Sequence, residues 1–583
     1  MVRFLLTLFM PQSVTVSAPV GATVPRAVSW QLAAQVAILI LAGFYVFAPA
    51  LHGAWLWDDG SMIRSNYLMA DANGWWKFWF APPGPDYFPL TSTVEWGIWR
   101  IFGDNTFPFH LTSLLLHLLS VFLLWRLFAR LGLKLAWFGA LIFVVHPLVV
   151  ESVAWMSELK NTVSLPFLLM SMLCWLRYDE RNRPTDLCAS LLLFLAAMLA
   201  KTSVVMLPFA LLLYTWWKHG GIPRKQLIAL AQFFGIALVL GVITVCFQQQ
   251  WAIGDDKMGV GGFPVQLAGA GWAILFYLGK FAWPVGLVPA YESWDFSNLS
   301  PIDFLPCAIL LAASAWIWLR RKTWGQPFIL GMGFFLLNLA PVLGFLPMSY
   351  MRIARVADHF VYLPMIGLIG LVIAGAELVR VALPRAVSTL AAVGLVSILA
   401  LQSHTYAGSF RNQEALWSHT LRVDPDSWLG ALDLGLTLND DHRLPEAEMW
   451  LRRSLLHNND FYGTHVALAD VLAQENHLDE AAIQYRIAWR QHPESLEIHI
   501  NYGNLLFRQN NFHGAEEQYY LATLYHPNSI EARYNLANML LRENRREEAI
   551  SQYQMVLRLD PDFTAAQDIL KKLRDNASAQ KTP

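Results

Sequence analysis

Residues 496–529 read LEIHINYGNLLFRQNNFHGAEEQYYLATLYHPNS, one unit of a repeat that fills the C-terminal part of the chain. The next unit, residues 530–563, reads IEARYNLANMLLRENRREEAISQYQMVLRLDPDF, with similar residues at matching positions. The same boundary recurs every 34 residues, at Pro425, Asn459, Pro493, Pro527 and Pro561. A fixed period of this length is typical of short helix pairs that stack into a curved solenoid with a binding surface.

Small residues recur inside each unit where the two helices of a pair must approach closely. With units at 428–461, 462–495, 496–529 and 530–563, position 8 is Gly or Ala and position 20 is always Ala. Position 24 holds one larger residue per unit: Leu451, Tyr485, Tyr519 and Tyr553. This is the pattern of tetratricopeptide repeats. We therefore predict four repeats over 428–571, preceded by a linker and partial repeat helix over 406–427 and followed by a disordered tail over 572–583.

The N-terminal part of the chain is far more apolar than the repeats. Over the whole sequence, apolar residues make up 55% and charged residues only 15%, which is typical of a membrane protein. Apolar windows predict about 11 spans, near 29–50, 109–129, 135–150, 162–177, 187–200, 203–217, 226–247, 303–320, 327–346, 360–380 and 386–404. The segment 264–290 is apolar but interrupted by glycines and a proline, so we expect it to be interfacial or re-entrant. The predicted fold is all-α, with a polytopic body over 29–405 followed by the repeat solenoid.

Basic residues predict the orientation of the body. They gather at one side of the predicted spans, at Arg126, Arg130, Lys134, Arg177, Arg181, Arg183, Lys218, Arg224, Lys225, Arg320, Arg321, Lys322, Arg380 and Arg385. Because basic loops favour the cytoplasmic side, the N-terminus (1–28) is predicted to be cytoplasmic and the repeats to lie on the opposite side. The net charge of −1 predicts no nucleic-acid binding, and four cysteines without metal-ligand spacing predict neither a zinc site nor a disulfide framework.

Polar residues that face the side opposite the cytoplasm are sparse, and they gather near the ends of spans. The stretch WLWDDGSMIRSN places Asp58 and Asp59 shortly after the first span. The others are His146, Glu151, Glu158, Lys160, Asn161, Lys201, Lys280, Arg352, Arg355, Asp358 and His359. Charge at membrane depth is costly, so such groups are candidates for function. Glu151, Trp155 and Glu158 also have the spacing of one helical face.

Several motifs, taken in order, resemble one family. They are WDDGSMIRSN, FPLTSTVEWGIWRIFGDNTFPFHLTSLLLHLL, HPLVVESVAWMSELKNTVS, LAKTSVVMLP, YLGKFAWPVGLVPAY and ADHFVYLPMIG. Over about residues 29–565 the chain is similar to the transmembrane and tetratricopeptide-repeat proteins, in particular their bacterial relatives. The resemblance implies a membrane glycosyltransferase of the GT-C fold and, from the animal members, protein O-mannosyltransferase activity. This chain departs from the animal pattern at Phe88, at Leu159-Lys160-Asn161 and at Asp358-His359, so the sugar and the acceptor are not carried over.

The resemblance also implies roles for the polar residues. Asp58 would be the general base that takes the proton from an acceptor hydroxyl, with Asp59 assisting it. The phosphate of a polyprenyl-phosphate donor would be held by Arg352, Arg355, Lys280 and Lys201. The sugar or acceptor would contact His146, Glu151, Trp155, Glu158, Lys160, Asn161, Asp358 and His359. The structural alternatives are a solvated helix end for the aspartates, lipid-headgroup contact for the cations, and a loop in which Lys160 pairs with Glu158 or Glu151.

The repeats carry asparagines in the first helices of two units, at Asn501, Asn504, Asn535 and Asn538. First helices line the concave face of this repeat class, so we expect these amides to hydrogen-bond the backbone of an extended peptide, the alternative being ordinary solvated positions.

We therefore expect a protein of the bacterial inner membrane with periplasmic repeats. It would transfer a sugar from a polyprenyl-phosphate donor to Ser or Thr hydroxyls of proteins docked on the repeats. No cofactor is expected apart from that donor, and the sequence does not decide whether a metal is needed. The alternatives are a transferase for glycan or lipid acceptors whose repeats recruit partner proteins, and a non-catalytic membrane-anchored scaffold.

Overall fold

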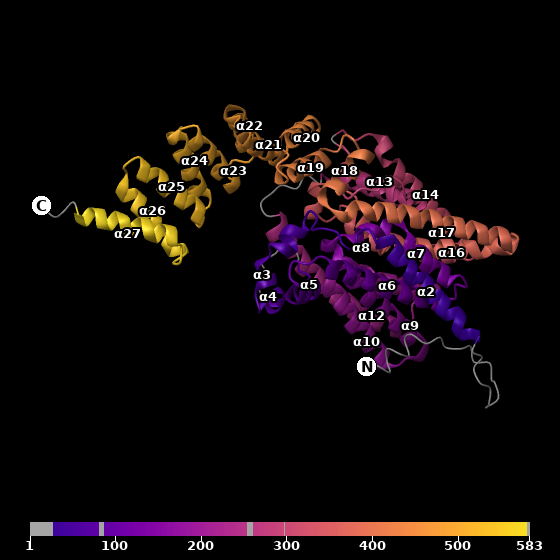
Figure 1. Ribbon diagram of the computed structural model, residues 1–583. Coiled ribbons are helices and arrows are strands. Elements are labelled where there is room, and N and C mark those ends of the chain that lie inside the picture. Colours follow the sequence, from indigo (N-terminus) through magenta and orange to yellow (C-terminus); the bar gives the residue numbers. More distant parts are fainter. Residues whose placement is uncertain (1–26, 81–86, 254–260, 297, 580–583) are drawn as a thin grey trace.

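The computed structural model describes residues 27–80, 87–253, 261–296 and 298–579. Within these ranges the regular elements are helices and there is no strand, which confirms the predicted all-α fold. Figure 1 shows a bundle of long helices, the body, and a row of short helices that extends away from it. The predicted cytoplasmic N-terminus lies outside the described residues except for its last two positions.

The body runs from α2 to α17. The first helix and the short helices that follow it are α2 (Ala27–Phe47), α3 (Tyr67–Ala70), α4 (Gly74–Phe80) and α5 (Pro89–Phe102). The central helices are α6 (Phe107–Arg130), α7 (Ala136–Val145), α8 (Val150–Ala154), α9 (Leu159–Arg181), α10 (Pro184–Ala200), α11 (Leu207–His219) and α12 (Arg224–Phe247). The last are α13 (Phe263–Ala282), α14 (Leu305–Leu319), α15 (Gly325–Leu339), α16 (Met365–Ala382) and α17 (Arg385–Ala407).

Among the described residues, nine helical segments are long and apolar enough to cross a membrane, or ten if the bent pair of α7 and α8 counts as one span. About 11 spans were predicted, and eight of the nine segments are among them. The ninth is α13, which was not expected to span. Of the other predicted spans, 135–150 is the bent pair, and α10 and α11 have only 17 and 13 residues. The predicted span 135–150 is bent by 62° after Val145, because Pro147 lacks the N–H that a continuous helix needs. In the middle of the body, most residues of the segment Met156–Arg181 are buried, and α6 and α10 pack against it.

The repeats join the body through α18 (Gln413–Val423), the partial repeat helix. Its Trp417 is buried and packs edge-on against Trp57, which follows α2 (ring centroids 5.3 Å apart). The backbone N–H of Ala54 donates to the carbonyl of Arg411 (2.9 Å), and His419 Nε2 lies 3.0 Å from the carbonyl oxygen of Leu287. We call the end of the body that α18 contacts the repeat-side end; it includes the C-terminal end of α2 and the loop that follows α13.

α13 is long enough to span a membrane, yet both of its ends lie at the repeat-side end. Phe263 at its start faces Phe345, in the loop between α15 and α16 (6.3 Å between ring centroids). Lys280 near its end donates to the carbonyls of Val285 and Gly286, each at 2.8 Å, and Gly286 lies beside α18. The contacts at both ends therefore join α13 to this end of the body, and the interfacial or re-entrant arrangement expected for 264–290 stays a prediction.

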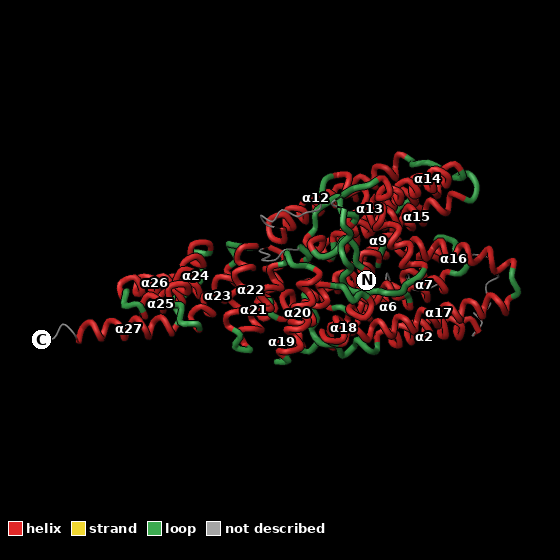
Figure 2. Tube along the Cα trace, turned by 90° about the horizontal axis from the view of Figure 1, so that it is seen from above, coloured by secondary structure: helices red, strands yellow, loops and turns green. Residues whose placement is uncertain are grey.

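The repeat helices follow the 34-residue period. The first helices of the four units are α19 (Trp428–Asp440), α21 (Tyr462–Gln474), α23 (Leu496–Arg508) and α25 (Ile530–Arg542). The second helices are α20 (Leu444–His457), α22 (Leu478–Gln491), α24 (Phe512–Tyr525) and α26 (Arg546–Leu559). Each pair is joined by a residue with φ between 58° and 66°, namely His442, Asn476, Asn510 and Asn544; asparagine tolerates this left-handed conformation better than most residues. Figure 2 shows the pairs continuing one after another away from the body.

The small residue at position 8 lets the two helices of a pair touch. A Cβ on Gly503 would lie 2.6 Å from Cε1 of Tyr519, and one on Gly435 would lie 2.7 Å from Cγ of Leu451. These are the position-24 side chains, which therefore fill the space that the glycines leave.

The C-terminal end differs from the prediction of a disordered tail over 572–583. Helix α27 (Thr564–Ala579) continues through most of that range, and residues 580–583 lie outside the described part. Ala566 and Leu570 of α27 are buried, since the last repeat needs a helix to cover its open side.

Candidate functional site

Asp58 and Asp59 lie at the repeat-side end, directly after the turn that follows α2. The buried carboxylate of Asp59 accepts hydrogen bonds from the N–H of Leu56 (2.8 Å) and from the N–H and hydroxyl of Ser157 (2.7 and 2.6 Å). Burial raises the pKa of Asp59 to about 7, although the hydrogen bonds from Ser157 oppose the rise. Asp58 is exposed. Asp59 therefore holds the loop against the segment before α9, and Asp58 is the member of the pair that a substrate can reach.

Glu158 lies at the centre of a buried cluster of charges. Lys160 Nζ lies 3.1 Å from Oε1, and Lys201 Nζ lies 3.1 Å from Oε2. Asn161 donates to Oε2 (2.5 Å) and accepts from Lys201 (2.8 Å). The ring of His359 completes the cluster, with Nε2 3.8 Å from Oε1. Two lysines therefore share one buried carboxylate, and the structural alternative in which Lys160 pairs with Glu158 is the arrangement seen.

Glu151 reaches the same cluster from the other side of His359. Its carboxylate lies 2.8 Å from Nδ1 of His359 and accepts the backbone N–H of that residue at 3.0 Å. The prediction that Glu151, Trp155 and Glu158 share one helical face is wrong, because Trp155 is extended (φ −93°, ψ 124°) and separates α8 from the next helical turn. The two glutamates nevertheless meet at His359, since the chain bends between them. Trp155 stacks on Trp57, with ring centroids 5.3 Å apart.

Asp358 is buried next to His359 but faces a different set of groups. The hydroxyl of Tyr291 donates to Oδ1 (2.8 Å) and that of Tyr406 to Oδ2 (3.3 Å). Burial raises the pKa of Asp358 to about 7, and the two tyrosine hydrogen bonds oppose the rise. Sequence reasoning named neither tyrosine as a site residue. Tyr291 ends the motif YLGKFAWPVGLVPAY, in which only Lys280 was singled out, and Tyr406 lies in a span with no pattern that sets it apart.

Glu95 of α5 is a second residue that sequence reasoning missed. Its side chain is buried, and burial raises its pKa to about 8, with the charge of Lys160 lowering it and that of Asp59 raising it. α5 thus places a further buried carboxyl group near Asp59 and Lys160. The signal in the sequence is a lone acidic residue in the apolar stretch LTSTVEWGIW.

Several candidates are engaged in holding the backbone. His146 Nδ1 accepts the N–H of Leu148 (3.2 Å), its Nε2 lies 3.1 Å from the carbonyl oxygen of Phe281, and its ring stacks on Phe281. Lys280 donates to two carbonyls of the turn that follows α13, and its ammonium lies 5.3 Å from the centre of the Tyr291 ring. These two residues join α13 to the rest of the repeat-side end.

Arg355 lies beside α13, and Arg352 ends a short helical turn in the same segment before α16. Arg352 is exposed. The guanidinium of half-buried Arg355 lies over the ring of Phe296 (5.3 Å), and its Nη1 is 3.1 Å from the position that a Cβ would take on Gly269. The structure therefore brings Lys201, but not this arginine pair, into the cluster around Glu158.

The asparagines of the repeats fall into two groups. The side-chain oxygens of Asn504 and Asn538 accept hydrogen bonds from Tyr519 (2.6 Å) and Tyr553 (2.5 Å) of the same repeat. Asn501 and Asn535 are half-buried, three residues earlier on the same helices. The tyrosine bonds engage the side-chain oxygens of Asn504 and Asn538, so only the N–H groups of these amides are left as candidates for binding a peptide.

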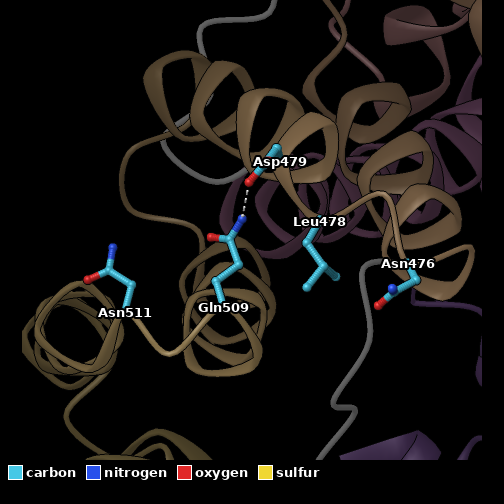
Figure 3. Close-up of a pocket in the computed structure, with 5 residues that line it drawn as sticks. All are labelled: Asn476, Leu478, Asp479, Gln509 and Asn511. Atoms are coloured by element: carbon cyan, nitrogen blue, oxygen red, sulfur yellow. Dashed lines mark hydrogen bonds between the residues drawn. The ribbon is translucent and has the colours of Figure 1, made fainter.

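Two hollows accompany these groups. The smaller, about 10 Å³, is lined by Asn161, Ser164, Leu165, Lys201, Ser203, Val204, Tyr362 and Leu363. The larger, about 520 Å³, lies on the repeats at the turns of neighbouring units, between Asn476, Leu478, Asp479, Gln509 and Asn511 (Figure 3). Gln509 donates to Asp479 across it (3.0 Å). In the part of the chain that the structure describes, no three His, Cys, Asp or Glu side chains are arranged to hold a metal ion.

Comparison with known proteins gives two family matches. Residues 84–245 match the family described as dolichyl-phosphate-mannose-protein mannosyltransferase, and residues 466–529 match a tetratricopeptide-repeat family. No curated protein matches the chain. A mannosyltransferase-type GT-C body followed by tetratricopeptide repeats is the arrangement of the transmembrane and tetratricopeptide-repeat proteins.

Solved structures similar to this chain are repeat proteins. One is YrrB, described as a TPR protein with an unusual peptide-binding site, at 18% identity over 27% of this chain and 81% of that one, with a TM-score of 0.25. Another is MamA from Desulfovibrio magneticus RS-1, at 13% identity over 26% and 85%, with a TM-score of 0.25. A third is PilF of Pseudomonas aeruginosa, at 23% identity over 26% and 72%, with a TM-score of 0.24.

Proposed function

We propose that this chain, a multi-pass membrane glycosyltransferase of the GT-C kind with tetratricopeptide repeats, modifies proteins. It transfers a sugar from a polyprenyl-phosphate donor to Ser or Thr hydroxyls of acceptors docked on the repeats. The reaction takes place on the periplasmic side of a bacterial inner membrane, the side that the basic loops assign to the repeats. Mannose is the sugar that the matched family favours.

The observation that carries this proposal is the position of Asp58. It is exposed at the repeat-side end of the body, while its neighbour Asp59 is fixed by Ser157. Behind it lies the buried cluster around Glu158. The same end receives α18, so a protein held by the repeats is delivered next to the polar groups.

In the proposed transfer, one proton moves to Asp58, one bond forms to the sugar and one bond between the sugar and the phosphate breaks. The acceptor hydroxyl attacks the anomeric carbon of the sugar and gives its proton to Asp58. The bond between that carbon and the phosphate oxygen breaks, and the lipid phosphate leaves with the bonding electron pair. Asp59 holds the loop so that the Asp58 carboxylate keeps its place during the attack.

The cations are divided between two tasks. Lys160 and Lys201 are already neutralised in part by Glu158, so they fix the cluster and place donors toward the sugar. Arg355 lies beside α13 and Arg352 is exposed three residues earlier in the chain, so we assign this pair to the phosphate of the lipid donor. Guanidinium groups bind phosphate in a bidentate manner, which stabilises the leaving group as its charge develops.

The experiment compares the periplasmic glycoproteome of four strains by intact-mass analysis. They carry the parent protein, a deletion, Asp58→Asn, and Asp104→Asn at equal protein levels. Asp104 is the matched control, because it also lies in the segment between α2 and α6 but forms an exposed ion pair with Arg64. We expect a Ser- or Thr-linked hexose to disappear in the deletion and Asp58→Asn strains and to persist in the control.

Other outcomes contradict parts of the proposal. If the deletion removes the sugar but Asp58→Asn does not, Asp58 is not the base. If the glycoproteome is the same in all four strains, protein glycosylation is refuted for the growth conditions used, and lipid-linked glycans become the material to compare.

A further inference from the structure

Trp57 comes directly before the aspartate pair and has a backbone conformation that bulky residues rarely adopt. Its φ angle is 41°, in the left-handed region, where the side chain of an L-residue is crowded by its own backbone. Among the described residues, the other non-glycine positions with positive φ are four asparagines and His442, all just after the end of a helix. A strained tryptophan persists only where surrounding contacts hold it, and such residues gather at functional sites.

The strained residue lies in a tight turn that carries Asp58. The N–H of Asp59 donates to the carbonyl of Leu56 (2.8 Å), and the N–H of Leu56 donates to the Asp59 carboxylate (2.8 Å). Trp57 and Asp58 are the two residues that these hydrogen bonds enclose. The backbone angles of the two central residues determine the shape of such a turn. The conformation of Trp57 therefore sets the direction in which the Asp58 side chain points.

Two indole rings hold the side chain of Trp57. Its ring is nearly parallel to that of buried Trp155 in the body, with 8° between the planes and 5.3 Å between the centroids. It also meets the ring of buried Trp417 edge-on, at 82° and 5.3 Å. Trp417 belongs to α18, where its Nε1 donates to the side chain of Gln413 (3.0 Å). The ring of Trp57 is thus held by the body and by the partial repeat helix together.

The helix α18 is also part of the repeat array. A Cβ on Gly430 of α19 would lie 3.2 Å from Cγ2 of Thr420 and 3.4 Å from Cγ of Leu421, so α18 packs directly against the first repeat. Figure 1 shows α18 where the row of repeat helices meets the body. A displacement of the first repeat relative to the body therefore moves Trp417, and with it one of the two contacts that hold Trp57.

We infer that Trp57 is a positioning residue for Asp58, and that the repeats act on it through Trp417. The inference rests on the proposed function, in which Asp58 accepts the proton of the acceptor hydroxyl. The two ring contacts offset the strain at Trp57 and keep the turn in its observed shape. Without Trp417 the turn relaxes toward ordinary backbone angles, which displaces the Asp58 carboxylate. The repeat array is therefore needed for the transfer step itself, in addition to docking the acceptor.

The test measures the apparent kcat and KM of the full-length protein for an acceptor protein found in the glycoproteome comparison. Membranes of the producing strain supply the lipid donor. The variants are Trp57→Ala, Trp417→Ala and the double variant. The matched control is Trp450→Ala, because Trp450 is a half-buried tryptophan of the first repeat whose ring lies by Arg453. Trp57→Ala should lose about 100-fold in kcat, the scale expected when a catalytic group is displaced by about 1 Å. Its KM should stay close to that of the parent, since the distal repeats are unchanged.

The double variant decides whether Trp417 acts through Trp57. Two changes that remove the same contact are not additive, so the double variant should be no slower than Trp57→Ala alone. Trp57→Ala combined with Trp450→Ala should instead show the product of the two separate losses. Trp57→Phe, which keeps a ring next to Trp155 and Trp417, should recover most of the lost rate. A role in folding alone would reduce the amount of folded protein and leave the kcat of the folded molecules unchanged.

Hydrogen exchange followed by mass spectrometry provides a readout that does not need activity. The N–H groups of Ala54 and Asp59 donate to the carbonyls of Arg411 (2.9 Å) and Leu56 (2.8 Å). These hydrogen bonds protect the amides as long as the turn keeps its shape. Peptides that cover residues 53–60 should therefore exchange faster in Trp57→Ala and Trp417→Ala than in the parent and in Trp450→Ala.

The inference is overturned if Trp57→Ala has the kcat of the control, or if the losses of Trp57→Ala and Trp417→Ala multiply in the double variant. If Trp57→Ala does not accumulate, Trp417→Ala and Trp417→Phe provide the same comparison. If Asp58→Asn abolishes transfer while the tryptophan variants behave as the control, the proposed function stands and this inference alone fails.

The failure of the proposed function gives a different result. If deletion of the protein leaves the glycoproteome unchanged, the role of Asp58 as a base is refuted together with the proposed function. Hydrogen exchange then still decides whether the repeats order the turn: equal exchange of residues 53–60 in Trp417→Ala and the parent refutes that coupling as well.

Discussion

Replacing Glu158 by glutamine tests how the buried cluster is held together. Glu158 is 3% exposed and lies 3.1 Å from each of two lysine ammonium groups, Lys160 and Lys201, which are 21% and 11% exposed. The variant Glu158→Gln keeps the shape of the side chain but removes the carboxylate that both lysines contact. The amide group of the new glutamine also lies beside the side-chain amide of Asn161, which donates a hydrogen bond to Oε2 of Glu158 in the parent.

The expected loss of stability follows from the low exposure of these side chains. Removing one partner of a buried ion pair leaves an uncompensated charge and typically costs about 3–5 kcal/mol. An exposed pair gives a very different value: Arg64 and Asp104 are 55% and 53% exposed, so Asp104→Asn should cost less than about 1 kcal/mol. The two variants each neutralise one carboxylate, and they differ mainly in burial.

Thermal denaturation of the detergent-purified full chain, followed by its retention in size-exclusion chromatography, provides the comparison. Glu158→Gln should denature well below the parent and Asp104→Asn close to it. The double variant Glu158→Gln with Lys201→Met should recover much of the loss, because it removes one of the two stranded charges. Equal stability of the two single variants would refute the reasoning, and so would a double variant less stable than Glu158→Gln alone.

Three further predictions concern two individual hydrogen bonds and the titration of one carboxyl group. Ser157→Ala removes one of the two hydrogen bonds that Ser157 makes to Asp59 and should lower the free energy of unfolding by about 1–2 kcal/mol in the same assay. The pKa of Asp433 rises on folding from 3.8 to about 8. The folded state therefore binds the extra proton, and the parent loses stability as the pH rises from about 4 to about 8. The denaturation temperature of Asp433→Asn should therefore differ less between pH 5 and pH 8 than that of the parent. Tyr553→Phe deletes the 2.5 Å bond to Asn538 and should cost about 1 kcal/mol in the unfolding of the repeats, followed by circular dichroism.

The repeats were predictable because their structure is local. Each unit carries its own small residue at position 8 and its own larger residue at position 24, which pack together as Gly503 and Tyr519 do, so the residues that determine the packing recur at a fixed spacing. The first helices accordingly begin at Trp428, Tyr462 and Leu496, in step with the period. The C-terminal helix could not be predicted in this way. No unit follows α27, so its amphipathic face has no periodic counterpart in the sequence.

The spans were predictable in position but not in length or shape. An apolar window reports the tendency to leave water, and it does not report where a helix bends or ends. Pro147 bends the third predicted span by 62°. The helix α11 is 13 residues long because Leu207 begins it only after a short turn at 202–206, which the window method includes in the span.

The site was predictable only in part, because its members come from distant elements. The sequence shows Asp59 and Glu158 as charged residues near the ends of spans, and both are buried in the structure. Their partners are not evident from local pattern. Ser157 is an ordinary serine in sequence, and Tyr291 lies 67 residues from the Asp358 that it contacts.

The tryptophans at the junction decide how the body and the repeats are best separated by truncation. Trp57 stacks on Trp155 and packs edge-on against Trp417 of α18, at 5.3 Å in both cases. A chain that ends near residue 405 therefore loses α18 as well as the repeats, and it exposes the loop that carries Asp58. Loss of activity in that truncation does not distinguish a missing acceptor platform from a damaged site.

A chain that ends near residue 460 keeps α18, α19 and α20, and with them the junction and Asp433, but loses the asparagines of the third and fourth units. We expect this shorter protein to stay folded in the membrane and to transfer sugar to short hydroxyl peptides while failing on full-length acceptor proteins. If it modifies full-length acceptors as the parent does, the distal repeats do not dock the acceptor.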